Sequence, residues 1–259
     1  MIKFNNVSFK YPNFCMKDLN FEIKKGEVVA ITGNNANGKT TIIKLISGAI
    51  KAKTGEIIFD QPINFNSKSK NKIRIGIVFQ NPDSQIIFNN VYDDICFTLR
   101  NFNIDKKEFD NRVDYALSLV KMTEFKHTDT YTLSTGQKQR IAIANMLAIK
   151  PDLIIFDEAS AYLDASTKQA LYSLFKDLKS QGITVIYTTN LIEEIVYADR
   201  VMVLDKGEMK AFLPIAEMLK NLNIFRENGT YIPLKLRIIE KFGLKEVEDD
   251  RILNQLGVK

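Results

Sequence analysis

The sequence predicts an α/β fold whose sheet is mostly parallel and covered by helices on both faces. A short β-branched segment, residues 27–32, is followed at once by a glycine-rich loop and by helical spacing over residues 39–49. A second apolar segment, residues 153–156, begins an alternation of strand and helix patterns that continues to residue 204. Such alternation is typical of parallel sheets, because each crossover between parallel strands needs a helix-sized connection.

The N-terminal half adds strands outside that repeating pattern. Residues 2–11 and 19–23 alternate apolar and polar side chains, as strands with one buried face do, and they predict an N-terminal antiparallel β region. Residues 56–59 and 74–79 predict two more strands. The polar segment between them, residues 61–72, is expected to be a loop.

The middle of the chain is helical. The pattern over residues 91–125 is helical with one apolar face, and a further helix is expected over residues 135–149. We therefore expect residues 88–148 to form a helical subdomain inserted into the α/β repeat. The elements expected after residue 153 are a helix at 166–180, a strand at 184–188, a helix at 193–198 and a last strand at 201–204. We therefore divide the chain into a domain at 1–210 and a C-terminal extension at 211–259, which holds two short amphipathic pieces around Pro233.

Composition excludes several classes of protein. A hydrophobic fraction of 45% over 259 residues is enough for a real core and excludes a disordered chain. The two cysteines, Cys15 and Cys96, form neither a disulfide framework nor a metal cluster. No signal peptide is expected, and no apolar run approaches the ~20 residues of a membrane helix. The net charge of +5 comes without a dense run of lysines, so we expect no nucleic-acid partner.

The pattern Gly33-x4-Gly38-Lys39-Thr40 follows a predicted strand and opens a helix, as a phosphate-binding loop requires. Its glycines let backbone N–H groups point at phosphates, and the helix N-terminus adds positive partial charge. Lys39 is expected to reach the β- and γ-phosphates of ATP, and the Thr40 hydroxyl to bind Mg²⁺. The residues assigned to nucleotide binding here are Gly33, Asn34, Asn35, Ala36, Asn37, Gly38, Lys39, Thr40 and Thr41.

Two carboxylates follow the buried strand at 153–156. Its carboxyl end is expected beside the phosphate loop, where Asp157 can hold Mg²⁺ through water and Glu158 can polarise an attacking water. Any buried strand can end in Asp-Glu, so it is the pairing with the phosphate loop that indicates ATP hydrolysis.

The segment Leu133-Ser134-Thr135-Gly136-Gln137 opens the helix at 135–149, whose free N–H groups suit another anion. Taken alone it is also an ordinary helix capped by Ser134. With the two motifs above, in this order and spacing, it resembles the ATP-binding-cassette (ABC) ATPases, whose signature is LSGGQ. The resemblance covers residues 1–210 and implies a P-loop NTPase core. It also implies that Ser134, Gly136 and Gln137 close over ATP held by a partner subunit.

The same resemblance assigns further roles. Tyr11 stands where the family stacks an aromatic ring on adenine, although alone it would also fit a core residue. Gln80 matches the glutamine that senses Mg²⁺ and water and faces the transport partner. Residues 160–164 match the D-loop, which crosses the dimer interface.

Three positions depart from the family pattern. Thr135 replaces the first signature glycine, Ala159 replaces the usual proline, and Asn190 stands where the switch histidine is expected. An asparagine can donate one hydrogen bond to the γ-phosphate but carries no charge. The single histidine, His127, is expected at the surface.

Residues 79–85, 91–95 and 136–144 resemble the A-component ATPases of energy-coupling-factor transporters for vitamins and metal ions. This resemblance implies a peripheral subunit on the cytoplasmic face of the cell membrane. The implied partners are a second ABC ATPase, a membrane T-component and a substrate-binding S-component. In a homodimer every site would combine Asn190 with Thr135, so we expect a different second ATPase, with the extension at 211–259 helping to hold the heterodimer.

Two alternatives stay open from the sequence. One is a soluble ABC protein acting on ribosomes or DNA, but such proteins carry two cassettes or a long coiled-coil insertion, which this chain lacks. The other is a regulatory subunit that binds ATP with little turnover. Asn190 and Thr135 favour that reading, and Glu158 opposes it.

Overall fold

The computed structural model describes residues 2–60, 73–227 and 230–242, and a six-stranded sheet lies at its centre. The strand order is β5-β6-β7-β3-β8-β9. All neighbours from β5 to β8 pair in parallel, and only β9 runs antiparallel to β8, which confirms the predicted α/β fold. The strands are β3 (Val28–Thr32), β5 (Ile75–Val78), β6 (Leu153–Asp157), β7 (Thr184–Thr189), β8 (Arg200–Asp205) and β9 (Glu208–Pro214).

The N-terminal antiparallel region is a separate three-stranded sheet with the order β2-β1-β4. Its strands are β1 (Ile2–Tyr11), β2 (Phe14–Ile23) and β4 (Thr54–Phe59). The β2 strand begins five residues before the segment that alternation predicted, 19–23. The alternation breaks at Asp18, whose φ of 50° is left-handed, and the pairing with β1 is irregular in this region.

Two hydrophobic clusters, one on each face of the central sheet, hold these layers together. In β3, Val29 and Ile31 face the cluster shared with α1 (Lys39–Ile46) and the antiparallel sheet. Val28 and Ala30 face the opposite cluster, which contains residues of α4 (Thr135–Ala148) and α5 (Ala165–Ser180). Because both faces are covered, the central strands are apolar on both sides rather than alternating.

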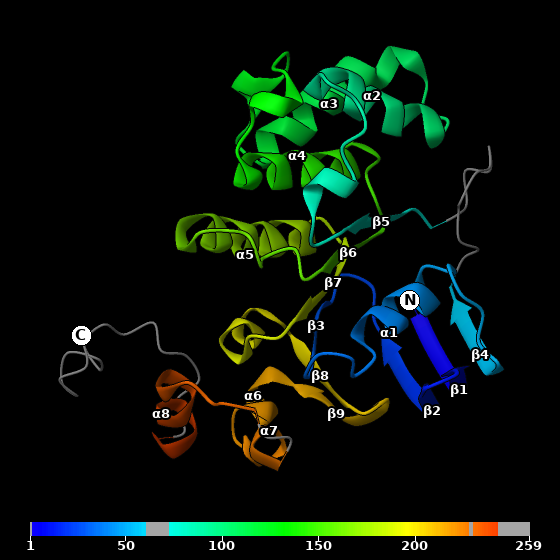
Figure 1. Cartoon of the computed structure of the whole chain (residues 1–259), viewed down its shortest axis with the longest axis vertical. Coiled ribbons are helices and arrows are strands. Elements are labelled where there is room, and N and C mark those ends of the chain that lie inside the picture. Colours follow the sequence, from blue (N-terminus) through cyan, green and yellow to red (C-terminus); the bar gives the residue numbers. More distant parts are fainter. Residues whose placement is uncertain (1, 61–72, 228–229, 243–259) are drawn as a thin grey trace.

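The helical segment gathers α2, α3 and α4 at one end of the molecule (Figure 1). The block predicted at 91–125 is divided into α2 (Val91–Asn101) and α3 (Phe109–Leu119), because Asn103 and Lys121 adopt left-handed φ values that end each helix. The described residues also contain 3-10 turns at η1 (Pro82–Ser84), η2 (Lys106–Glu108), η3 (Thr123–Phe125), η4 (Thr130–Thr132) and η5 (Ile192–Tyr197). The last of these replaces the helix predicted at 193–198.

The strand predicted as the last, 201–204, is not the last, because β9 follows it across a tight turn. The sequence of β9 is only half apolar, as suits an edge strand that is partly exposed, so its pattern did not stand out. The division placed at residue 210 falls inside this strand. The chain continues through α6 (Ile215–Met218), α7 (Asn223–Glu227) and α8 (Leu234–Phe242), which lie at the end opposite to α2–α4 (Figure 1).

Two expectations reach outside the described residues: the loop at 61–72 and the part of the extension beyond 242. Within the described ranges, no helix has the length and apolar character needed to cross a bilayer. His127 is exposed, as predicted.

Candidate functional site

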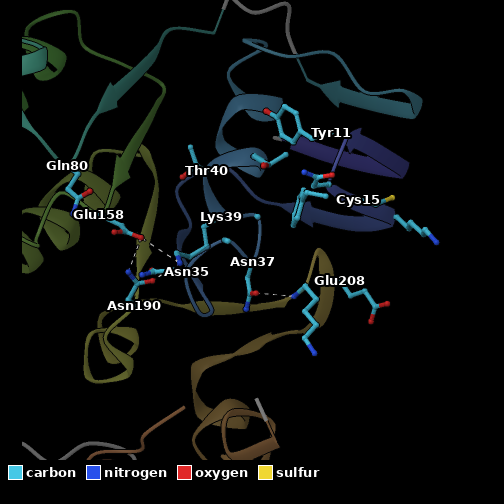
Figure 2. Close-up of a pocket in the computed structure, with 17 residues that line it drawn as sticks. Tyr11, Cys15, Asn35, Asn37, Lys39, Thr40, Gln80, Glu158, Asn190 and Glu208 are labelled. Atoms are coloured by element: carbon cyan, nitrogen blue, oxygen red, sulfur yellow. Dashed lines mark hydrogen bonds and ion pairs between the residues drawn. The ribbon is translucent and has the colours of Figure 1, made fainter. Parts of the chain in front are cut away.

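The site forms where the phosphate loop meets the carboxyl ends of β6 and β7. These strands and β3 are parallel, so their carboxyl ends meet at one edge of the sheet, where α/β proteins bind ligands. An open pocket of about 1120 Å³ lies at this edge (Figure 2). The predicted site residues that line it are Tyr11, Asn35, Ala36, Asn37, Gly38, Lys39, Thr40, Thr41, Gln80, Glu158 and Asn190.

The loop conformation depends on its two glycines. Gly33 has a φ of 148°, and a Cβ there would lie 2.2 Å from the Leu204 carbonyl oxygen. Gly38 has a φ of 105° at the start of α1. The Asn37 amide donates to the Leu204 carbonyl at 3.0 Å, and its oxygen accepts from the Lys206 backbone N–H at 3.2 Å. The side chain of Asn37 therefore fastens the loop to the β8–β9 turn and leaves only its backbone for a phosphate.

Lys39 reaches into the loop with a side chain that is only 5% exposed. Its Nζ donates to the carbonyl oxygens of Gly33 at 2.8 Å and Asn34 at 3.2 Å, and to Asn190 Oδ1 at 2.5 Å. Burial lowers the pKa of Lys39, and the Glu158 carboxylate, 3.6 Å from Nζ, acts in the opposite direction. All these acceptors are oxygens that the oxygens of a bound phosphate can replace.

Asn190 uses both ends of its amide. While Oδ1 accepts from Lys39, Nδ2 donates to Glu158 Oε1 at 3.0 Å. Figure 2 shows the three side chains turned toward one another, and Gln80 lines the same pocket. A neutral side chain thus connects the ammonium of the phosphate loop with the candidate catalytic carboxylate.

Thr188, to which the sequence assigned no role, holds both carboxylate residues at the end of β6. Its hydroxyl donates to Asp157 Oδ1 at 2.8 Å and accepts the Glu158 backbone N–H at 2.9 Å. That contact secures Glu158 in a left-handed conformation with a φ of 52°. The signal available in the sequence was only its place in a strand, two residues before Asn190.

Asp157 faces the Thr40 side of the loop. Burial raises the pKa of its carboxyl, Glu158 adds to that effect, and hydrogen bonds from Thr188 and Thr40 oppose it. A cation beside Asp157 would favour the ionised form that burial disfavours. The hydroxyl of Thr40, the carboxylate of Asp157 and the amide oxygen of Gln80 are all oxygen donors, which is the chemistry that Mg²⁺ prefers. The residues present therefore fit the predicted metal.

Tyr11 borders the part of the pocket away from Glu158 (Figure 2). Its side chain is 36% exposed, so the alternative of a core residue does not hold. Its ring forms a T-shaped pair with Phe9, with centroids 4.7 Å apart, and the exposed part of the tyrosine remains available to a flat ligand.

The signature residues are not brought to this pocket. Ser134 and Gln137 form a reciprocal capping box at the start of α4: Gln137 N–H donates to Ser134 Oγ at 3.3 Å, and Ser134 N–H donates to Gln137 Oε1 at 2.8 Å. Apart from its chain neighbours and its own helix backbone, a Cβ on Gly136 would meet no atom of the described residues within 4 Å. The start of α4 is therefore an open surface, as a segment that closes over another subunit's nucleotide requires.

The pocket also has walls that the sequence did not predict. Gly207 sits so close to β2 that a Cβ would lie 2.0 Å from the Cys15 carbonyl oxygen. The β8–β9 turn and the β1–β2 hairpin thus form one wall, and no sequence signal links these distant segments. The added lining residues are Asn13, Phe14, Cys15, Lys17, Lys206 and Glu208.

Comparison with known proteins places these features in a family. The family model described as "ABC transporter" matches residues 16–161. The chain is 37% identical to "Energy-coupling factor transporter ATP-binding protein EcfA1" of Leuconostoc mesenteroides over 90% of this chain and 87% of the relative. Identity to the protein of that name from Staphylococcus aureus is 39%, over 94% of this chain and 92% of the relative.

Solved structures of ABC transporter proteins superpose on this chain. The cbiO1 protein of Clostridium perfringens, described as part of the ABC transporter complex cbiONQ, superposes with a TM-score of 0.77 at 33% identity, covering 92% of this chain and 98% of that one. A dimeric ATP-binding cassette in a post-hydrolysis state, bound to ADP and Pi, superposes with a TM-score of 0.69 at 25% identity, covering 83% of this chain and 99% of that one.

Proposed function

The chain belongs to the ABC transporter family, and we propose that it is the ATP-binding and ATP-hydrolysing subunit of an energy-coupling-factor importer for vitamins or metal ions. Relatives of that name align with nine-tenths of its length. The observation that carries the proposal is the convergence of Lys39, Glu158 and Asn190 on the phosphate loop, within one open pocket.

In the proposed reaction the γ-phosphate takes the place of the protein oxygens around Lys39. The Glu158 carboxylate, released from the lysine, polarises the water that attacks the γ-phosphorus and accepts its proton. We assign Asn190 Nδ2, which donates to Glu158 in this structure, to turn to the phosphoryl oxygens as their charge develops.

Mg²⁺ fits the oxygen donors of Thr40, Asp157 and Gln80, and when bound it neutralises charge on the β- and γ-phosphates. Thr188 keeps the Asp157 carboxylate in place through its 2.8 Å hydrogen bond. Tyr11 is assigned to the adenine ring, because it is a partly exposed aromatic side chain that lines the pocket.

A second ATPase is needed to complete the site, because Ser134, Gly136 and Gln137 lie away from the pocket of their own chain. A homodimer would place Asn190 opposite Thr135 in both composite sites. A different partner, with an intact signature and a switch histidine, leaves one departure in each site, which favours a heterodimer. The segment 211–259 is assigned to holding this dimer.

The remaining partners are a membrane T-component that the ATPases grip and an S-component that selects the substrate. This arrangement makes the chain a peripheral protein on the cytoplasmic face of the cell membrane. The relatives named as energy-coupling factor subunits do not favour the alternatives of a regulatory or a soluble non-transport ABC protein.

The test is purification of the tagged chain from detergent-solubilised membranes, followed by identification of what accompanies it and an ATPase assay of the complex. We expect a second ABC ATPase, two membrane proteins and Mg²⁺-dependent hydrolysis that Lys39→Ala abolishes. A chain recovered without membrane proteins, and without ATPase activity when mixed with a second ABC ATPase of the same cell, would refute the proposal.

A further inference from the structure

A buried carboxylate lies behind the site, and the mechanism above does not use it. Glu194 is 3% exposed and sits in η5, just after β7. Its Oε2 accepts from Ser160 Oγ at 3.0 Å and from Thr189 Oγ1 at 2.5 Å, and its Oε1 accepts from Lys168 Nζ at 3.1 Å. A buried carboxylate is costly unless it is paired and hydrogen-bonded, and here both oxygens are engaged.

The two hydroxyls belong to two different segments of the ATP site. Thr189 ends β7 directly before Asn190, and its Oγ1 also accepts the Leu191 backbone N–H at 3.0 Å. Ser160 lies two residues after Glu158, in the segment assigned to the interface with the partner ATPase. One carboxylate oxygen therefore joins the loop that carries Asn190 (residues 189–195) to the segment that follows Glu158 (residues 158–164).

We propose that Glu194 is a positioning residue that couples these two segments, so that a change in the interface segment is transmitted to Asn190. The catalytic part of this inference rests on the proposed function, because it assumes that Asn190 faces the γ-phosphate. The coupling itself does not, since it is argued from the shared Oε2 contact and not from a bound nucleotide.

The fold offers a way to separate coupling from stability. The η5 turn is also held by Tyr187 Oη, which donates to the Glu194 backbone carbonyl at 2.7 Å, and by the buried side chains of Ile192 and Ile195. Removal of the carboxylate leaves these contacts intact. The preceding residue, Glu193, is exposed and has the same side chain, so it provides a matched control.

The first experiment measures amide hydrogen exchange of segments 158–164 and 189–195 in the full chain. Glu194→Ala should speed exchange in both segments by about tenfold, because the loss of a hydrogen bond to a charged group favours local opening by about that factor. Glu193→Ala should change exchange in neither segment. Ser160→Ala should also speed exchange in 189–195, by at least about twofold, because the interaction free energy between residues of one hydrogen-bond network is at least about that large. The serine control is Ser180→Ala, at the exposed end of α5, whose Oγ donates to the Asp177 carbonyl at 2.7 Å, outside both measured segments.

Confinement of the Ser160→Ala effect to 158–164, or equal behaviour of Glu194→Ala and Glu193→Ala, would overturn the coupling. If Glu194→Ala does not fold, the comparison of Ser160→Ala with the serine control is sufficient to test the coupling.

The second experiment measures ATP hydrolysis by the membrane complex. Glu194→Ala should lower kcat by about tenfold and leave KM for ATP within about twofold, because the substrate contacts are untouched. Glu194→Gln should keep at least half of kcat, because its amide oxygen still accepts from both hydroxyls and Lys168 can turn to solvent. Equal losses in the two variants would contradict the positioning role. Absence of hydrolysis in the unchanged complex would instead refute the proposed function, while the exchange data still decide the coupling.

Discussion

Replacement of Asn190 with histidine, the switch residue of the family, tests whether residue 190 limits the rate of ATP hydrolysis at this site. The amide now connects Lys39 Nζ, 2.5 Å away, with Glu158 Oε1, 3.0 Å away. During hydrolysis charge builds on the phosphoryl oxygens, and a donor that is already in place acts mainly on the transition state. An amide supplies a neutral donor there, whereas a protonated imidazole supplies a charged one.

The expected gain follows from the difference between these donors. A neutral hydrogen bond contributes ~0.5–1.5 kcal/mol and one to or from a charged group ~1.5–3 kcal/mol. The difference of about 1–1.5 kcal/mol corresponds to a roughly tenfold faster chemical step. ATP affinity should change little, because the phosphate replaces Asn190 as the acceptor for Lys39 in either protein.

The assay is single-turnover hydrolysis in a heteromeric complex whose other site is disabled. Asn190→Ala removes the donor altogether and is the opposite test: its hydrolysis should be slower than that of the unchanged chain. The histidine advantage should grow from about pH 8 to about pH 6.5, since the imidazole gains its charge near its usual pKa of about 6.5. A histidine variant that is no faster at any of these pH values would refute the idea that residue 190 limits this site.

Four further predictions concern the same site. Lys39→Ala should abolish ATP binding and hydrolysis in a folded protein, because it removes the charge that meets the phosphates; unchanged binding by calorimetry would refute the loop assignment. Glu158→Gln should leave ATP binding intact and slow turnover, because the amide cannot polarise water as a carboxylate does; an ATP-stabilised dimer by gel filtration is expected, and normal turnover would rule Glu158 out as the base. Thr188→Val should lower kcat by about tenfold, because it removes the partner of the partly buried Glu158 N–H, at a cost near the lower end of the ~1–3 kcal/mol for an unpaired buried group. The isosteric change should alter ATP affinity by less than about twofold, and an unchanged kcat would remove Thr188 from the mechanism. Pairing should be heteromeric, because a homodimer combines Asn190 with Thr135 in both sites; a purified homodimer that drives uptake at full rate without a second ATPase would contradict this.

The parts of the site that were predictable are local in sequence. The phosphate loop could be recognised because a strand, two glycines and a helix start occur within about fifteen residues of one another. Asp157 and Glu158 could be placed beside it because parallel strands end at the same edge of a sheet. In the same way the apolar segments at 27–32 and 153–156 were sufficient to predict a central sheet covered on both faces.

Other elements were missed because their pattern was locally interrupted. The bulge at Asp18 hid the first half of β2, and the left-handed residues Asn103 and Lys121 divided a helical pattern that looked continuous. The edge strand β9 was missed because half-exposed strands need few apolar residues.

The sequence by itself determined the chemistry of this protein, because a nucleotide site needs particular side chains at short, fixed spacings. Only the tertiary structure decided how those side chains are held. The hydrogen bonds from Lys39 through Asn190 to Glu158 connect Lys39 with a carboxylate more than a hundred positions away in the sequence. Glu194 connects two segments, 158–164 and 189–195, and nothing in either sequence predicts a contact with the other. Such contacts depend on which strands become neighbours in the sheet, and that order is set by the packing of the whole chain.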